Sequence, residues 1–116
     1  MNVSFEKLAL TTLVIPEGRL DFSSAASFEK QLNEVLAGAG TAPRAVIIDC
    51  AALDYVSSAG LRAFLLAARG SQRAGISFAL CALKPAVREV FDLSGFTRII
   101  TIYADRATAL AHAPQG

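Results

Sequence analysis

The chain has 116 residues, of which 53% are hydrophobic and 18% charged, and its formal net charge is +1. This length and hydrophobic share predict one domain over residues 1–116 that folds without disulfides or metal, and they exclude a disordered chain. Because the charged residues are scattered and nearly balanced, we do not expect a nucleic-acid-binding protein.

Met1 is followed directly by polar and charged residues rather than by a basic and then an apolar segment. The most apolar stretches are interrupted within about ten residues, which is too short to span a bilayer. The sequence therefore predicts a cytoplasmic protein without a secretory signal and without membrane insertion.

The first part of the chain predicts a β-hairpin followed by a helix. Residues 3–8 and 10–15 are rich in β-branched side chains, which is typical of strands. Residues 17–19 contain a glycine between charged residues and predict a turn, and helical spacing of apolar side chains runs from about residue 24 to 37. The candidate N-caps of this helix are Asp21, Ser23 and Ser24. The segment 38–43 then ends it.

The rest of the chain alternates strands and helices. The expected elements are a buried strand at 45–48, a helix at 58–74, a strand at 76–81, a helix at 85–93, a strand at 99–103 and a short helix after Asp105. Alternation of this kind predicts an α/β fold with right-handed crossovers between parallel strands. We expect a mixed sheet of four or five strands with the helices mainly on one face.

Two adjacent hydroxyl groups mark the start of the central helix. Ser57 and Ser58 follow a strand-to-helix loop, and the simpler interpretation is that they cap free N–H groups of the helix. The same N–H groups and the helix dipole can also hold an anion such as a phosphate. Gly60 lowers helix propensity in the first turn, which suits close approach by another backbone.

Four motifs in order extend this picture. Gly18 to Asp21 reads Gly-Arg-Leu-Asp, residues 46–49 read Val-Ile-Ile-Asp, residues 55–61 read Tyr-Val-Ser-Ser-Ala-Gly-Leu, and Pro85-Ala86-Val87 precedes Phe91-Asp92-Leu93-Ser94-Gly95-Phe96. With these motifs the chain resembles, over nearly its whole length, the STAS domain of bacterial anti-sigma-factor antagonists. The resemblance implies the same α/β fold.

The resemblance also implies a partner switch. In such proteins the unphosphorylated antagonist binds an anti-sigma factor that is also a serine kinase, and phosphorylation of a loop serine ends the interaction. Aligned on Gly60, that serine is Ser58. The family's Asp before the serine is Ser57 here, and the following Ser or Thr is Ala59. Ser57 is therefore the alternative phosphoacceptor, and modification of neither serine is the third possibility. A serine phosphatase would reset the switch, and we expect the free protein to be a monomer.

A contact surface for the partner follows from the same alignment. It comprises Asp21, Ser57, Ser58, Ala59, Gly60, Leu61, Arg62 and Leu66. The alternative for Asp21 is a simple helix cap. Arg62, Arg69 and Arg73 share one helix face with Leu66, which is either a solvated face or an exposed leucine among arginines that suits a protein-binding patch.

Other function classes have less support. Catalysis is not expected, because the only histidine, His112, lies far along the chain from the serines and no nucleophile elbow or phosphate-binding glycine motif is present. Asp49 and Asp54 could form an acid–base pair or hold Mg²⁺, although such residues more often cap a loop. No cofactor is expected. The competing functions are a constitutive STAS subunit of a lipid-transport ATPase and a sensor that binds a nucleotide or anion at the helix start.

Two cysteines, Cys50 and Cys81, end predicted buried strands. A reducing compartment and the absence of zinc-site spacing favour two small core residues. A redox pair is the alternative if neighbouring parallel strands bring the two thiols together.

Overall fold

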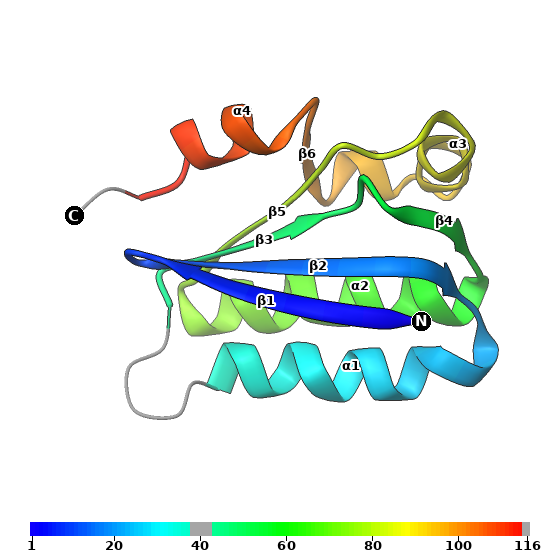
Figure 1. Ribbon diagram of the computed structural model, residues 1–116, viewed down its shortest axis with the longest axis horizontal. Coiled ribbons are helices and arrows are strands. Elements are labelled where there is room, and N and C mark those ends of the chain that lie inside the picture. The colour runs from blue at the N-terminus through cyan, green and yellow to red at the C-terminus, as the bar shows by residue number, and fades with distance from the viewer. Residues whose placement is uncertain (38–42, 115–116) are drawn as a thin grey trace.

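The computed structural model of the chain describes residues 1–37 and 43–114 and is an α/β fold with one mixed sheet (Figure 1). The strands are β1 (Asn2–Leu8), β2 (Thr11–Leu20), β3 (Ala45–Asp49), β4 (Leu53–Val56), β5 (Ser77–Cys81) and β6 (Thr101–Tyr103). The helices are α1 (Phe22–Ala37), α2 (Ser58–Ala74), α3 (Pro85–Leu93) and α4 (Arg106–Ala111), and the short 3₁₀ helix η1 is Phe96–Arg98. The predicted fold class is confirmed.

Five strands lie in the order β1-β2-β3-β5-β6, and β4 adds a sixth by pairing with β2. The hairpin β1–β2 is antiparallel, whereas β2–β3, β2–β4, β3–β5 and β5–β6 are parallel. Parallel neighbours need a crossover connection. α1, α2 and α3 supply crossovers between parallel strands.

The long strand β2 pairs with two different strands along one side. Its pairing with β3 ends at Val14, and its pairing with β4 begins at Gly18. Pro16 lies between these two stretches, where its missing N–H removes no ladder hydrogen bond. Gly18 has a φ of 96°, the register shifts after it, and its N–H donates to the Ala52 carbonyl at 2.9 Å. This β-bulge at Gly18 lets β2 change its pairing partner from β3 to β4.

This pairing corrects two sequence predictions. Residues 17–19 are not a turn, because the bulge at Gly18 lets β2 continue to Leu20. Residues 53–56 were expected to be a loop but form β4.

The predicted ranges 58–74 and 85–93 are confirmed as α2 and α3, while α1 begins at Phe22 rather than near residue 24. The last strand starts at Thr101 rather than at residue 99, because η1 ends at Arg98 and the N–H groups of Ile99 and Ile100 donate to the Phe96 carbonyl. Residues 38–42 of the predicted helix-ending segment lie outside the described residues.

Helices cover both faces of the sheet unequally. Figure 1 shows α1 and α2 side by side on one face and α4 on the other. The main core lies under α1 and α2 and also receives Phe91 from α3. The expectation that the helices lie mainly on one face is confirmed, and a smaller cluster of Leu13, Ile47, Cys81 and Ala109 packs beneath α4. Across the described ranges, no helix is both long and apolar enough to cross a membrane.

Three phenylalanines join the helices of the main core. The Phe64 ring packs edge-on against Phe28 with centroids 5.4 Å apart and against Phe91 with centroids 5.3 Å apart. All three side chains are fully buried. Phe64 therefore holds α1, α2 and α3 together from the middle of α2.

Replacing Phe64 with alanine should lower the free energy of unfolding by about 3–5 kcal/mol, because it removes a buried ring and leaves a cavity. Chemical denaturation measures this loss. Phe22, which is 86% exposed, provides the matched control. Phe22→Ala should stay within about 0.5 kcal/mol of the parent. Equal losses for both variants would contradict the proposed core.

Candidate functional site

The starts of helices α1 and α2 lie side by side at the carboxyl ends of strands β2 and β4. Leu20 at the end of β2 pairs with Val56 at the end of β4, and the Ser57 N–H donates to the Leu20 carbonyl at 2.8 Å. Because the two strands are parallel neighbours, the helices that follow them begin next to each other. We call the exposed region formed by Asp21, Phe22, Ser57 and Ser58 the helix-start surface.

The two serines have different structural roles. Ser57 is the N-cap of α2, and its Oγ accepts a hydrogen bond from the Gly60 N–H at 3.1 Å. Ser58 is the first residue of the helix and is exposed. Its side chain makes no hydrogen bond within the part of the chain that the structure describes. The hydroxyl of Ser57 is thus occupied, whereas that of Ser58 is available for chemistry.

Asp21 is the corresponding cap of α1. Its Oδ1 accepts hydrogen bonds from the Ser23 N–H at 3.1 Å, the Ser23 hydroxyl at 2.7 Å and the Ser24 N–H at 3.2 Å. The Ser24 hydroxyl oxygen accepts in return from the Asp21 N–H at 3.0 Å. The hydrogen bond from the Ser23 side chain is the main cause of the lowered pKa of Asp21. Asp21 therefore acts as the N-cap of α1. The residue before it, Leu20, is bonded to Ser57, so Asp21 also lies near the start of α2.

Gly60 and Leu61 do not form part of the exposed surface. Both residues are buried, so the exposed placement expected for them differs from the structure, while their contact with a partner stays a prediction. A Cβ atom on Gly60 would lie 2.8 Å from Leu20 Cγ and 3.1 Å from the Leu20 carbonyl oxygen. The close approach that Gly60 permits is therefore to β2 of the same chain. The neighbouring Ala59 is half-buried and packs against the core.

The arginine face of α2 is exposed, but its leucine is not. Arg62, Arg69 and Arg73 are exposed, while Leu66 is half-buried. Of the two alternatives for this face, the one with an exposed leucine differs from the structure in that Leu66 is only partly exposed. Arg62 is one helical turn beyond Ser58 and remains a candidate contact residue.

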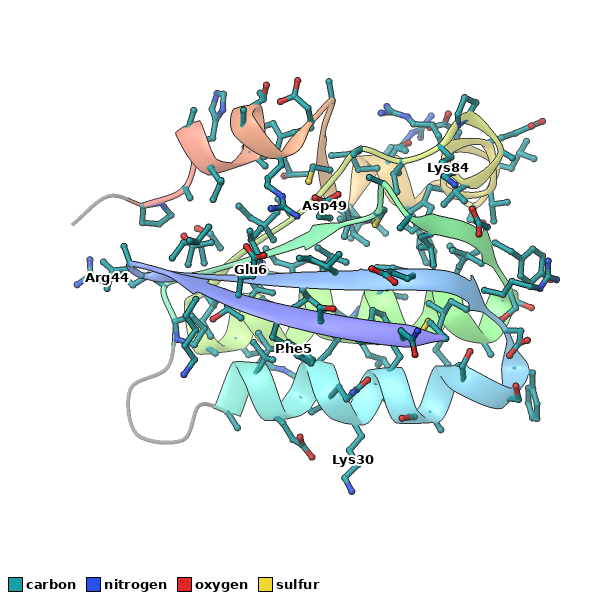
Figure 2. All side chains as sticks on the ribbon, in the orientation of Figure 1. Phe5, Glu6, Lys30, Arg44, Asp49 and Lys84 are labelled. Atoms are coloured by element: carbon teal, nitrogen blue, oxygen red, sulfur yellow. The ribbon has the colours of Figure 1, made fainter. Side chains whose placement is uncertain are left out.

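Sequence reasoning missed several residues around the helix starts. Phe22 is 86% exposed in the first turn of α1. It was not singled out from the sequence, because the helix was expected to begin near residue 24. The Arg19 guanidinium lies 4.1 Å from the centre of the Tyr55 ring, and these two residues are direct partners across β2 and β4. Lys84, labelled in Figure 2, forms an ion pair with Asp54 of β4. The pairing of β4 with β2 places Tyr55 beside Arg19, which the sequence alone did not predict.

The two acidic residues considered for catalysis have separate partners. Asp49 Oδ1 accepts from the Ala51 N–H at 3.0 Å, and its Oδ2 accepts from Arg106 Nε at 2.8 Å. Asp54 is paired with Lys84 instead. Within residues 1–37 and 43–114, no group of three or more His, Cys, Asp or Glu side chains could hold a metal ion. The arrangement supports structural roles for both aspartates.

The cysteines are free and buried. The Cys50 N–H donates to the Cys81 carbonyl at 2.9 Å, so the two residues are neighbours. Burial raises the pKa of Cys50 well above its usual value and that of Cys81 to about 12. Because the thiolate is the reactive form, these environments favour core residues over a redox pair.

Comparison with known proteins places this geometry in a family. The model of the STAS domain matches residues 2–109 of the chain. The chain is 35% identical over 111 residues to BtrV of Bordetella bronchiseptica, by its name a candidate anti-sigma factor antagonist. This match covers 96% of the chain and 93% of BtrV.

Solved structures share the fold. A candidate anti-sigma factor antagonist from Thermotoga maritima has a TM-score of 0.88 at 18% identity, and the match covers 97% of this chain and 95% of that one. The anti-sigma factor antagonist SpoIIAA in its unphosphorylated form has a TM-score of 0.77 at 22% identity, covering 94% and 93%. Phosphorylated SpoIIAA of Bacillus has a TM-score of 0.72 at 19% identity, covering 95% and 97%.

Gly60→Ala should destabilise the protein by about 1–3 kcal/mol, because the added methyl group meets Leu20 and its carbonyl. Gly70, in the same helix, is the matched control, since a Cβ atom there would make an ordinary contact with Leu36 Cδ1 at 3.5 Å and, apart from its own stretch of the helix, meets no other atom of the described residues within 4 Å. Gly70→Ala should stabilise by up to about 1 kcal/mol through helix propensity. Urea unfolding of both variants measures the difference, and a stabilising Gly60→Ala would disprove the close packing.

Asp21→Asn should reduce the loss of stability on acidification. A carboxyl group with a lowered folded pKa stabilises the protein above its unfolded pKa of about 3.8, and this contribution disappears as the pH falls through the folded pKa. Asparagine keeps an N-cap oxygen but does not titrate. Unfolding free energies from about pH 5 to about pH 2 test the prediction. Identical acid dependence in parent and variant would contradict it.

Proposed function

The chain belongs to the STAS domain family, and we propose that it is an anti-sigma factor antagonist controlled by phosphorylation of Ser58. In this proposal the unmodified protein binds an anti-sigma factor that is a serine kinase, and phosphate on Ser58 releases it. The carrying observation is the exposed hydroxyl of Ser58 at the start of α2, next to an already occupied Ser57. The relationship to BtrV supports the same class of function.

The geometry favours Ser58 over Ser57 as the phosphoacceptor. A kinase that modified Ser57 would act on the oxygen that accepts the hydrogen bond from the Gly60 N–H, and it would disturb a helix cap worth about 1 kcal/mol. Ser58 can be modified without this loss. Serine and aspartate are both good N-caps, so Ser57 keeps the structural role of the aspartate usual in the family.

A phosphate on Ser58 would change the surface more than the fold. It adds about −1.5 to −2 charges at a helix N-terminus, where the dipole and free N–H groups favour negative charge. Arg62, one turn further along α2, adds a nearby positive charge. The similar folds of SpoIIAA in its unphosphorylated and phosphorylated forms support a modification that this architecture tolerates.

The helix-start surface has the chemistry of a protein contact. Phe22 offers an exposed aromatic anchor, and aromatic and arginine residues are enriched at binding hot spots. Arg19, stacked on Tyr55, and Arg62 place positive charge around it. We infer a partner surface that is apolar in the middle and acidic at its rim, which a phosphate on Ser58 would repel.

The proposal also includes the location of the protein, its mode of action and the enzyme that removes the phosphate. The protein acts in the cytoplasm by binding rather than by catalysis, and a serine phosphatase restores the unmodified form. The competing function is a constitutive transporter subunit, which is compatible with Ser57 standing where the family usually has aspartate. Ser57 caps α2, so a serine at this position is compatible with the structure that the proposed switch needs.

Mass spectrometry of the protein from its native host, with fragment mapping, tests the site. We expect phosphate on Ser58 in the parent, no phosphate in Ser58→Ala, and retained phosphate in the matched variant Ser57→Ala. Ser58→Asp should weaken binding to the cognate kinase at least about tenfold in Kd, because it adds negative charge to the contact.

Other outcomes would redirect the proposal. Phosphate lost in Ser57→Ala but retained in Ser58→Ala would move the site to Ser57. Unchanged kinase affinity of Ser58→Asp would remove the electrostatic release mechanism. A protein that is never modified and copurifies with one stable membrane-transport complex would instead support a constitutive subunit.

A further inference from the structure

The free edge of β1 is a second feature of the surface, separate from the helix-start surface. β1 is an edge strand that pairs only with β2, in a regular register over all seven residues from Asn2 to Leu8. Natural sheets protect such edges with prolines, bulges, short strands or several charges. β1 contains no proline and no bulge. Its outer side is therefore able to pair with another strand.

The proline in β2 determines which residues of β1 offer backbone groups at this edge. Val3 lies opposite Pro16 in an uninterrupted antiparallel ladder. Because Pro16 has no N–H, this pair must be a non-hydrogen-bonded pair of the ladder. By alternation the same holds for Phe5 and Lys7. The N–H and C=O groups of Val3, Phe5 and Lys7 therefore point outward from the sheet.

Apolar side chains gather along the same edge. Phe5 is 42% exposed, and Met1 and Leu8 are exposed to a similar extent. Phe5 lies opposite Val14 and so faces the side of α1 and α2, whereas Glu6 faces the side of α4. Figure 2 shows these two side chains on opposite sides of β1. An exposed phenylalanine in the middle of an open edge favours burial by a partner strand.

We propose that β1 pairs with β1 of a second copy of this chain, antiparallel and centred on Phe5. A two-fold axis normal to the sheet keeps paired side chains on the same face, which requires pairing of Phe5 with its own copy, Glu6 with Ser4 and Lys7 with Val3. All three outward-pointing residues then form hydrogen-bonded pairs. No like charges are opposed, whereas centring the pair on Glu6 would place two carboxylates opposite each other.

This proposal goes beyond the proposed function and departs from the monomer expected for a chain of this size. The dimer joins two sheets into one continuous sheet across the β1 edges. Because a single strand pair buries little area, we expect a weak and concentration-dependent dimer. Pairing through β1 uses none of the residues of the helix-start surface.

Sedimentation equilibrium of the full chain tests the dimer at about 10 to 500 µM, the range suited to a small interface. The parent should shift from monomer towards dimer with concentration. Phe5→Lys should raise the dimer Kd about tenfold or more, because it removes the central apolar contact and opposes two positive charges. Leu93→Lys changes an apolar residue on α3 that is even more exposed than Phe5, 82% against 42%, and should leave the Kd unchanged.

Cysteine cross-linking tests the register. Phe5→Cys should give a disulfide-linked dimer under mild oxidation, since opposed Cα atoms of a hydrogen-bonded pair lie about 5.5 Å apart. Lys7→Cys should not, because it lies opposite Val3, and the native cysteines are buried. Far-UV circular dichroism checks that each variant folds. A monomer throughout the concentration range, or a dimer equally strong in Phe5→Lys, would overturn the proposal whether or not Ser58 is phosphorylated.

Discussion

The parallel pairing of one long strand, β2, with two successive strands is the constraint on which the functional region depends. β2 runs beside β3 as far as Val14 and beside β4 from Gly18 onward. This change of partner is possible because Pro16 needs no donor in the gap and Gly18 adopts a left-handed conformation. The end of β2 thereby lies next to the end of β4, and the starts of α1 and α2 come together.

Close packing holds the start of α2 against the end of β2. The missing side chain of Gly60 lets α2 approach Leu20, while the Ser57 N–H bonds the Leu20 carbonyl. Below this contact, Phe64 joins α2 to α1 and α3. Because these groups are buried, the exposed Ser58 belongs to a helix that is packed firmly against the core. A binding surface built in this way can receive a charge without losing its fold.

The opposite face of the sheet has a different organisation. Arg106 at the start of α4 donates to Asp49 at 2.8 Å and lies 3.6 Å from Glu6 of β1. The buried carboxylate of Asp49 thus has a charged partner, which buried charges need. The contact with Glu6 also links the edge strand to the carboxyl end of β3. The surface proposed for regulation and the edge proposed for self-pairing therefore depend on different interactions of one sheet.

The sequence by itself determined the α/β class, the bounds of α2 and α3 and the position of Ser57 and Ser58 at a helix start. These features follow from local signals: apolar periodicity, helix-breaking glycines, Pro85 at a first helical position and hydroxyl side chains that cap. Only the tertiary structure decided that residues 53–56 form a strand, because four residues without clear alternation carry little local signal. That pairing placed Arg19 in contact with Tyr55. The tertiary structure likewise decided that Gly60 and Leu61 are buried and that Phe22 is exposed. Burial and contact across strands depend on residues distant in sequence, so no local pattern contains them.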